Sequence, residues 1–129
     1  VDFDCSLNKN EMVGLVRSLV TSYQNAINHG CKESGFKVVP HISDDGQDIE
    51  IVVSNIVSRD KLVELNQKKV LEKVPAFSVD DDHELLTTEG GTGLYKTYRY
   101  LIDFCKNAKF SVSVDENVFS QKMCISKEL

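Results

Sequence analysis

Residues 9–29 read KNEMVGLVRSLVTSYQNAINH and carry the strongest periodic pattern in the chain. Apolar side chains recur there at intervals of three and four, which is the spacing of one face of an α-helix. Asn8 followed by Glu11 matches a capping box, and Gly30 suits the left-handed position that closes many helices. The stretch therefore predicts one long helix. Its predicted buried stripe comprises Met12, Val13, Leu15, Val16, Leu19, Val20, Tyr23, Ala26 and Ile27.

Two strands are predicted after this helix, over residues 36–42 and 48–54. Apolar side chains alternate with polar ones in both segments, which is the period of a half-buried strand. Asp44 to Gln47 includes Gly46 and forms a typical tight-turn sequence, so the two strands make an antiparallel hairpin. Pro40 has no N–H to donate to a neighbouring strand, which predicts that the first strand lies at a sheet edge or is irregular.

The second half of the chain predicts the same pair of elements, a helix and then a hairpin. Residues 59–74 have a helical composition that stops before Pro75, and residues 78–89 have few apolar anchors and read as a loop or short mobile helix. A glycine-rich turn at residues 90–93 leads into a helical stretch that reaches Cys105. Residues 109–115 and 118–126 then form a second predicted hairpin.

This order of elements predicts the fold class. Long helices separated by hairpins favour an α+β fold, a two-layer α/β sandwich in which helices cover one face of a mixed, mostly antiparallel sheet. We find no internal repeat and no low-complexity linker, so residues 1–129 are expected to form a single domain.

The composition limits the classes of function. The chain has 129 residues, of which 41% are hydrophobic and 27% charged, and this is enough for one domain with a substantial core. The 15 basic and 20 acidic residues give a net charge of −5, which argues against nucleic-acid binding because that affinity depends on Lys and Arg. No segment approaches the roughly 18 apolar residues of a membrane-spanning helix.

The spacing of the four cysteines bears on the cellular compartment and does not indicate a metal or disulfide site. Cys5, Cys31, Cys105 and Cys124 lack the close spacing of a zinc site or of a disulfide framework, so a reducing, cytoplasmic setting is expected. The chain begins at Val1 and not at a methionine, from which we expect a processed chain or a piece of a longer one.

The sequence Gly90-Gly91-Thr92-Gly93-Leu94 is the sharpest motif. A glycine-rich turn that opens a helix exposes backbone N–H groups at the positive end of the helix dipole, and such a turn holds phosphate well. Lys96, one turn into the helix, would add a positive charge. The motif is neither a Walker loop nor a Rossmann fingerprint. A flexible hinge with a helix cap explains this segment equally well when it is taken alone.

A second motif lies near the end of the first helix. Asn25 and His29 are four residues apart and therefore share a helix face, and the carboxamide oxygen of Asn25 is the kind of ligand that Mg²⁺ prefers. Taken alone, the pattern is more often explained by ordinary polar positions near a helix end, with His29 interacting with the helix dipole.

Together and in this order, the two motifs resemble those of the GHKL superfamily of ATP-binding domains, which includes the catalytic domains of histidine kinases, gyrase B and MutL. Residues 22–29 look like the asparagine box of that superfamily, and Gly91-Thr92-Gly93-Leu94 looks like its later glycine box. The order of the predicted elements is also similar over nearly the whole chain. The resemblance implies a Bergerat-like fold that binds ATP with Mg²⁺.

The resemblance also assigns roles to residues. It implies that Asn25 is the magnesium ligand and that Gly91, Thr92 and Gly93 surround the phosphates. An Asp in the family's first glycine box contacts the adenine amino group, and Asn55 stands at that place here without the two glycines that usually follow. An Asn side chain can still accept from the adenine amine. The full set implied to bind the nucleotide is His29, Asn55, Gly90, Gly91, Thr92, Gly93, Leu94 and Lys96.

Two departures from the family bear on catalysis, and no catalytic residue is assigned. Members that hydrolyse ATP have a Glu four residues before the box asparagine, where this chain has Thr21, which is not a useful base. The chain also lacks a helix pair with a phospho-accepting histidine. Residues 56–89 occupy the place of the family's ATP lid, and the acidic run Asp80-Asp81-Asp82 within them reads best as a solvated segment.

These inferences predict a Mg²⁺-dependent ATP-binding domain of a bacterial-type sensor kinase or an ATPase-like regulatory protein. Its expected partners are ATP and other domains of the same chain or a partner protein. The main alternative is a degenerate interaction module that keeps the fold with little nucleotide affinity. A third possibility, an independent ATPase, is disfavoured by Thr21.

Overall fold

The computed structural model describes residues 7–31, 35–42, 48–67, 69–77 and 92–126. The long helix α1 spans Lys9–His29 as predicted, and the capping box at its start is confirmed. Asn8 Oδ1 accepts from the Glu11 N–H at 2.8 Å, and Glu11 Oε1 accepts from the Asn8 N–H at 3.0 Å. These two bonds satisfy N–H groups that have no partner inside the helix.

The sheet confirms both predicted hairpins. The strands β1 (Phe36–Ile42) and β2 (Asp48–Ile56) pair antiparallel, as do β3 (Ala108–Asp115) and β4 (Val118–Ser126). The hairpins join through β2 and β4 in the order β1-β2-β4-β3, so β1, the strand with Pro40, lies at an edge. All pairings between the described strands are antiparallel. Strand β2 continues two residues beyond its predicted end, so Asn55 lies inside the strand.

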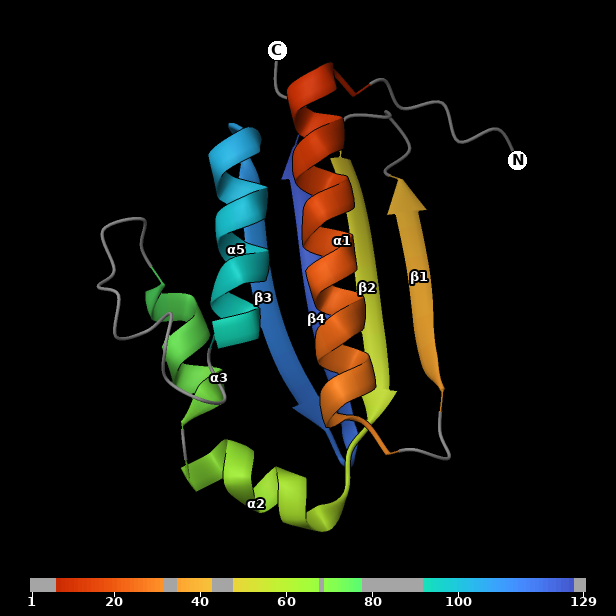
Figure 1. The fold of residues 1–129 in the computed structure, drawn as a ribbon, viewed down its shortest axis with the longest axis vertical. Coiled ribbons are helices and arrows are strands. Elements are labelled where there is room, and N and C mark those ends of the chain that lie inside the picture. Colours follow the sequence, from red (N-terminus) through yellow and green to blue (C-terminus); the bar gives the residue numbers. More distant parts are fainter. Residues whose placement is uncertain (1–6, 32–34, 43–47, 68, 78–91, 127–129) are drawn as a thin grey trace.

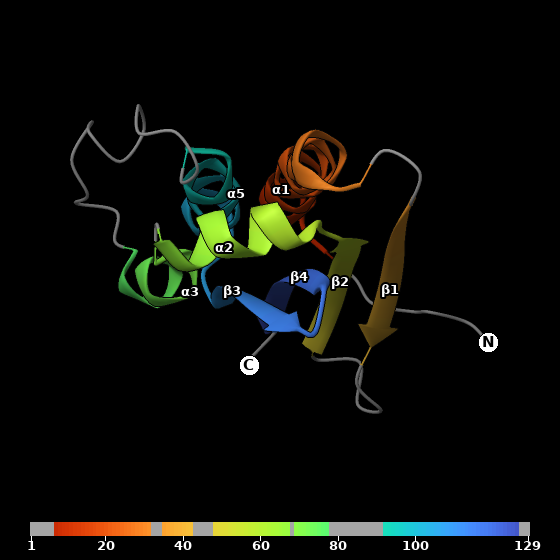
Figure 2. The ribbon, with the colours of Figure 1, turned by 90° about the horizontal axis from the view of Figure 1, so that it is seen from below.

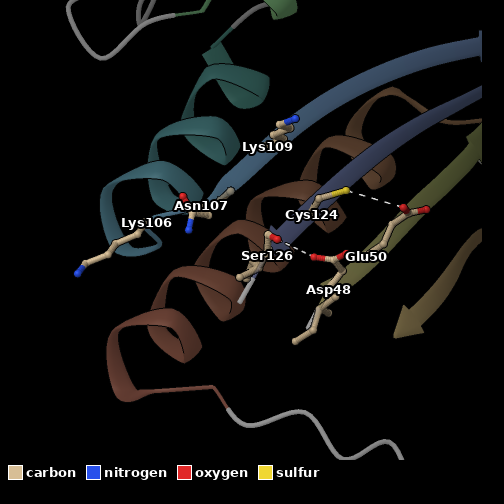
Figure 3. Close-up of a pocket in the computed structure, with 10 residues that line it drawn as sticks. Asp48, Glu50, Lys106, Asn107, Lys109, Cys124 and Ser126 are labelled. Atoms are coloured by element: carbon tan, nitrogen blue, oxygen red, sulfur yellow. Dashed lines mark hydrogen bonds between the residues drawn. The ribbon is translucent and has the colours of Figure 1, made fainter. Parts of the chain in front are cut away.

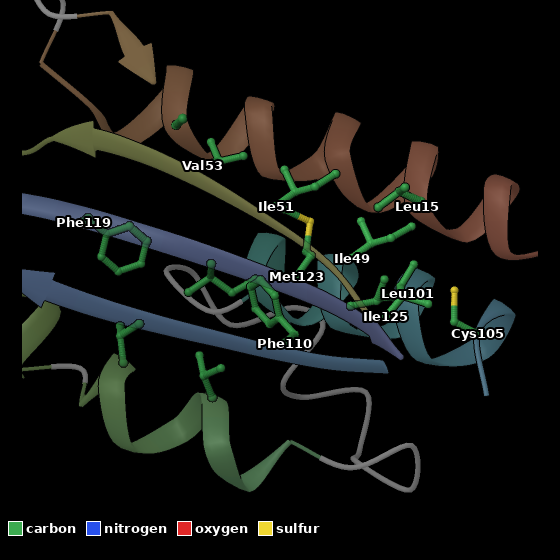
Figure 4. Packing of buried hydrophobic residues seen from close by; sticks show 14 of the residues in the cluster. Leu15, Ile49, Ile51, Val53, Leu101, Cys105, Phe110, Phe119, Met123 and Ile125 are labelled. Atoms are coloured by element: carbon green, nitrogen blue, oxygen red, sulfur yellow. The ribbon is translucent and has the colours of Figure 1, made fainter. Parts of the chain in front are cut away.

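The architecture is the predicted α+β sandwich. Figures 1 and 2 show α1 and α5 (Thr92–Phe104) side by side on one face of the sheet. The core lies between these two helices and the inward side chains of β2, β3 and β4 (Figure 4). The helices approach closely at Gly14, where a Cβ would lie 2.6 Å from Phe104 Cβ.

The prediction for the buried face of α1 is wrong in part. Met12, Val16, Val20 and Ile27 are between 49% and 65% exposed, although they belong to the apolar stripe. The helix instead turns small and polar side chains towards α5 and the sheet, because these allow the close approach of the two helices. The buried residues of the described helix include Leu15, Ser18, Thr21, Ser22, Asn25 and Ala26.

The segment 59–74 is also different from the single helix that its composition predicts. It forms α2 (Arg59–Gln67) and the short α3 (Val70–Lys73), followed by a 3-10 turn over Val74–Ala76. The break comes at Lys69, whose φ of 54° is left-handed and incompatible with a continuous right-handed helix.

The closing position of α1 is a further correction. Gly30 has φ −80° and ψ 166°, which is extended backbone and not the predicted left-handed conformation. Lack of space explains the glycine, since a Cβ there would lie 2.6 Å from the Ala26 carbonyl oxygen and 3.1 Å from Asn55 Nδ2. The predicted turn at residues 44–47 and the predicted loop at 78–89 lie outside the described residues.

Candidate functional site

The end of α1, the end of β2 and the start of α5 meet at one end of the molecule (Figure 1). Because α1 and α5 run in opposite directions, the asparagine near the end of α1 comes to lie beside the glycine at the start of α5. The two motifs are 68 residues apart in the sequence, from Asn25 to Gly93, and the fold brings them into contact.

The carboxamide of Asn25 is held in one orientation. Its Nδ2 donates to Gln121 Oε1 at 3.1 Å and to Thr97 Oγ1 at 3.4 Å, so both N–H groups of the amide point into the interior. The residue is 9% exposed. These bonds tie α1 to the first turns of α5 and to the middle of β4, and they leave Oδ1 as the outward atom.

Gly93 makes room for that outward oxygen. A Cβ built on Gly93 would overlap with Asn25 Oδ1, so an alanine cannot replace the glycine without movement. Within the described part of the chain, Oδ1 accepts no hydrogen bond, and the first turn of α5 contains no acidic side chain. The carboxamide oxygen of Asn25 thus lies beside the N–H groups that open a helix.

Hydroxyl groups complete the buried network around Asn25. Thr97 Oγ1 lies 3.0 Å from both Thr21 Oγ1 and the Gly93 carbonyl oxygen, and its single proton can serve one of them at a time. The hydroxyl of Thr21 donates to carbonyl oxygens of its own helix, those of Arg17 and Ser18. Thr21 is thus a buried structural hydroxyl.

Asn55 is the second polar side chain of the site. It is 4% exposed, and neither its Oδ1 nor its Nδ2 has a hydrogen-bond partner among the described residues. An amide that is buried without partners costs about 1–3 kcal/mol. Its Nδ2 lies near Gly30, so Asn55 packs against the end of α1, one turn beyond Asn25. The amide of Asn55 thus keeps one acceptor and one donor that no described group uses.

The other predicted site residues are distributed as follows. Leu94 is buried in the core, and Lys96 is exposed on the first turns of α5. Gly90 and Gly91 lie outside the described residues, as do the side chains of Thr92 and His29.

Sequence reasoning missed Thr97 and Gln121, both fully buried. Each had a recognisable signal. Thr97 lies three residues after Leu94 and four before Leu101, within the apolar stripe of α5, and Gln121 lies between Phe119 and Met123 on the apolar face of β4. A polar residue inside an apolar pattern predicts a buried hydrogen-bond network.

A separate cavity of 530 Å³ lies at the opposite end of the sheet (Figure 3). Four of its polar side chains are paired with each other: Cys124 Sγ lies 3.8 Å from Glu50 Oε2, and Ser126 Oγ donates to Asp48 Oδ1 at 2.6 Å. Burial, assisted by the neighbouring Glu50, raises the pKa of the Cys124 thiol. The thiol therefore stays protonated at neutral pH, and this cavity offers no activated nucleophile.

Comparison with solved structures identifies the fold. A nucleotide-free form of the catalytic domain of the histidine kinase ThkA superposes with a TM-score of 0.59 at 20% identity, over 88% of this chain and 66% of that one. The Acinetobacter baumannii histidine kinase AdeS superposes with a TM-score of 0.53 at 13% identity, over 90% of this chain and 47% of that one. The chain has the fold of these histidine-kinase catalytic domains.

This fold is found by comparison of structures and not by comparison of sequences. No protein-family model matches the sequence, and no curated protein matches it. The matched region spans about two thirds of the ThkA chain and about half of the AdeS chain. No described helix is long and apolar enough to cross a membrane.

The residues of the site fit Mg²⁺ with a nucleotide. Asn25 Oδ1 is a neutral oxygen ligand of the type Mg²⁺ accepts, and among the described residues no three His, Cys, Asp or Glu side chains are grouped to hold a metal ion. The ion would therefore need phosphate and water oxygens for its remaining ligands, as is usual at nucleotide sites. Asn55 fits a purine edge, which presents both donors and acceptors.

Proposed function

We propose that this chain is a Mg²⁺-dependent ATP-binding domain of a sensor kinase or a related regulatory protein. The observation that carries the proposal is the contact between Asn25 and Gly93. The carboxamide oxygen of Asn25 points at the start of α5, and it fits there because Gly93 has no Cβ. The unpartnered, buried Asn55 supports it independently.

Each residue has a part in this proposal. Asn25 binds the metal through Oδ1, and the N–H groups at the start of α5, together with Gly90 and Gly91, hold the phosphates. Asn55 contacts the base, Lys96 adds a positive charge one turn into α5, and His29 is the last residue of α1. A bound magnesium ion supplies positive charge to the triphosphate, which explains how a protein of net charge −5 can hold it with few basic side chains.

The proposal is tested by calorimetric titration with ATP in the presence and absence of Mg²⁺. We expect binding that strengthens with Mg²⁺, and no heat from Mg²⁺ alone because the described protein ligands are too few. Asn25→Ala should lower the affinity for Mg²⁺·ATP by about 10- to 100-fold, the usual effect of losing a group that orders a metal site. Gln24→Ala, an exposed neighbour on α1, is the control and should bind like the wild type.

Absence of binding at millimolar nucleotide would overturn the proposal and favour the interaction module. The loss of the first-box glycines is the feature that would then explain the lost affinity.

Hydrolysis gives a separate prediction. Because Thr21 Oγ1 is committed to carbonyl oxygens of α1 and has no basicity, we expect no release of phosphate from ATP by the isolated chain above the rate of a blank. A malachite-green assay over several hours measures this. Release that is sensitive to Asn25→Ala would show that the chain is an ATPase with a base elsewhere.

A further inference from the structure

Gln121 connects the backbone of α1 to the candidate metal ligand. It is fully buried in the middle of β4, where its Nε2 donates to the Ser22 carbonyl oxygen at 3.2 Å and its Oε1 accepts from Asn25 Nδ2 at 3.1 Å. Both amides are buried between α1 and the sheet, so water does not compete for either hydrogen bond.

The Ser22 carbonyl determines the direction of both bonds. A carbonyl oxygen can only accept, so Gln121 must turn its Nε2 towards α1 and its Oε1 towards Asn25. The oxygen of an amide can also only accept. Asn25 must therefore donate to Gln121 Oε1 through Nδ2, which turns its own Oδ1 away from Gln121. The hydroxyl of Thr97 accepts from the same Nδ2 at 3.4 Å, which favours the same orientation of the Asn25 amide.

We propose that Gln121 is a positioning residue that selects which atom of the Asn25 carboxamide faces the start of α5. Without it, the amide would rotate by half a turn and present Nδ2, which cannot bind a cation, for part of the time. This proposal rests on the proposed function, and it adds that β4, which carries neither sequence motif, determines the metal dependence of the site.

The first test reads the orientation without any nucleotide. In wild-type protein, the Asn25 side-chain NH₂ should be resolved by NMR and protected from hydrogen exchange, because both protons are buried in hydrogen bonds. Gln121→Met, similar in size, should remove this protection. Gln121→Glu keeps an acceptor facing Nδ2 and should retain it, although a carboxylate facing the Ser22 carbonyl lowers stability.

This pair separates positioning from packing. If Gln121 only stabilises the packing of α1 on β4, the less stable of the two variants should show the greater loss of hydrogen-exchange protection at the Asn25 NH₂. The less stable variant is expected to be Gln121→Glu and not Gln121→Met. Equal protection of the Asn25 NH₂ in wild type and Gln121→Met would overturn the proposal. Should the Met variant not fold, the Glu variant decides, since loss of Asn25 protection in a folded Gln121→Glu contradicts the proposed acceptor role.

The second test measures the gain in ATP affinity that Mg²⁺ produces. Gln121→Met should reduce this gain by about 10-fold and leave the affinity measured in EDTA unchanged, as expected for a group that orients a metal ligand. Ser120→Ala is the matched control, because it removes a cross-strand hydrogen bond to Ser54 on the opposite face of the same strand. The control should keep the full gain.

A double-mutant comparison sharpens the second test. In an Asn25→Asp background, both side-chain atoms at the end of residue 25 are oxygens, so the orientation of that group no longer matters for metal binding. Gln121→Met should then change the increase in ATP affinity produced by Mg²⁺ by less than about 2-fold. If Gln121→Met reduces the increase in ATP affinity produced by Mg²⁺ by about 10-fold in both backgrounds, the proposal is overturned. If wild type does not bind ATP, the proposed function fails and the NMR result alone decides the role of Gln121.

Discussion

Gly93→Ala is expected to lower the affinity for Mg²⁺·ATP by about 100-fold, at the upper end of the effects seen when a metal site is misordered. The added methyl would occupy the position of Asn25 Oδ1, so either the candidate ligand is displaced or the start of α5 moves. Both changes separate the metal ligand from the N–H groups that we propose to hold the phosphates.

The same substitution should also destabilise the protein, which is the opposite of what helix propensity predicts. Gly to Ala inside a helix ordinarily adds up to about 1 kcal/mol of stability. Overpacking of a closed site costs about 1–3 kcal/mol, and the network of Asn25, Thr97 and Gln121 would be disturbed as well. The free energy of unfolding from urea titration measures the net effect.

Gly35→Ala is the matched control for Gly93→Ala. No atom lies within 4 Å of a Cβ built there, so stability and affinity should stay close to those of the wild type. A Gly93→Ala protein that is as stable as this control, and that binds Mg²⁺·ATP normally, would show that Asn25 Oδ1 does not occupy the space beside Gly93 in solution.

Asn55→Val is expected to separate stability from binding. The free protein should gain about 1–3 kcal/mol of unfolding free energy, because the substitution removes a buried amide whose oxygen and nitrogen have no partners. Binding should be lost, since Val can neither donate to nor accept from a base. A ligand at 100 times its dissociation constant stabilises a protein by about 2.7 kcal/mol, so a thermal-shift assay with Mg²⁺·ATP shows the loss directly.

Ser54→Val controls for the intrinsic preference of Val for strands. Ser54 precedes Asn55 on β2, faces the opposite side of the sheet and bonds Ser120 at 3.0 Å. This control should keep the full nucleotide-induced shift. If Asn55→Val is destabilised, the amide has partners in solution; if it keeps the shift, Asn55 does not contact the nucleotide.

The local elements were predictable because they depend on neighbours in sequence. The α1 boundaries follow from the capping box at Asn8 and the apolar spacing, and the edge position of β1 follows from Pro40, which lacks a donor. The resemblance implied one nucleotide site built from the asparagine and glycine motifs, and the fold places Asn25 beside Gly93.

The burial of α1 was not predictable from its periodicity. Apolar spacing placed Val16 and Val20 inside, yet both are about half exposed, whereas Ser18 and Ser22 are fully buried. Which face of a helix turns inward depends on the surface that it packs against. Here α5 and β4 present Thr97 and Gln121, and the polar side of α1 supplies hydrogen-bond partners for both.

The sequence by itself determined the long helix α1, the two hairpins and the two motifs, because these depend on interactions within a few residues. Tertiary structure alone decided which atom of Asn25 faces Gly93, because that choice depends on Gln121, 96 residues away along the chain. It also decided that Asn55 is buried without a partner, since burial without compensation is a property of the packed fold and leaves no trace in composition or spacing.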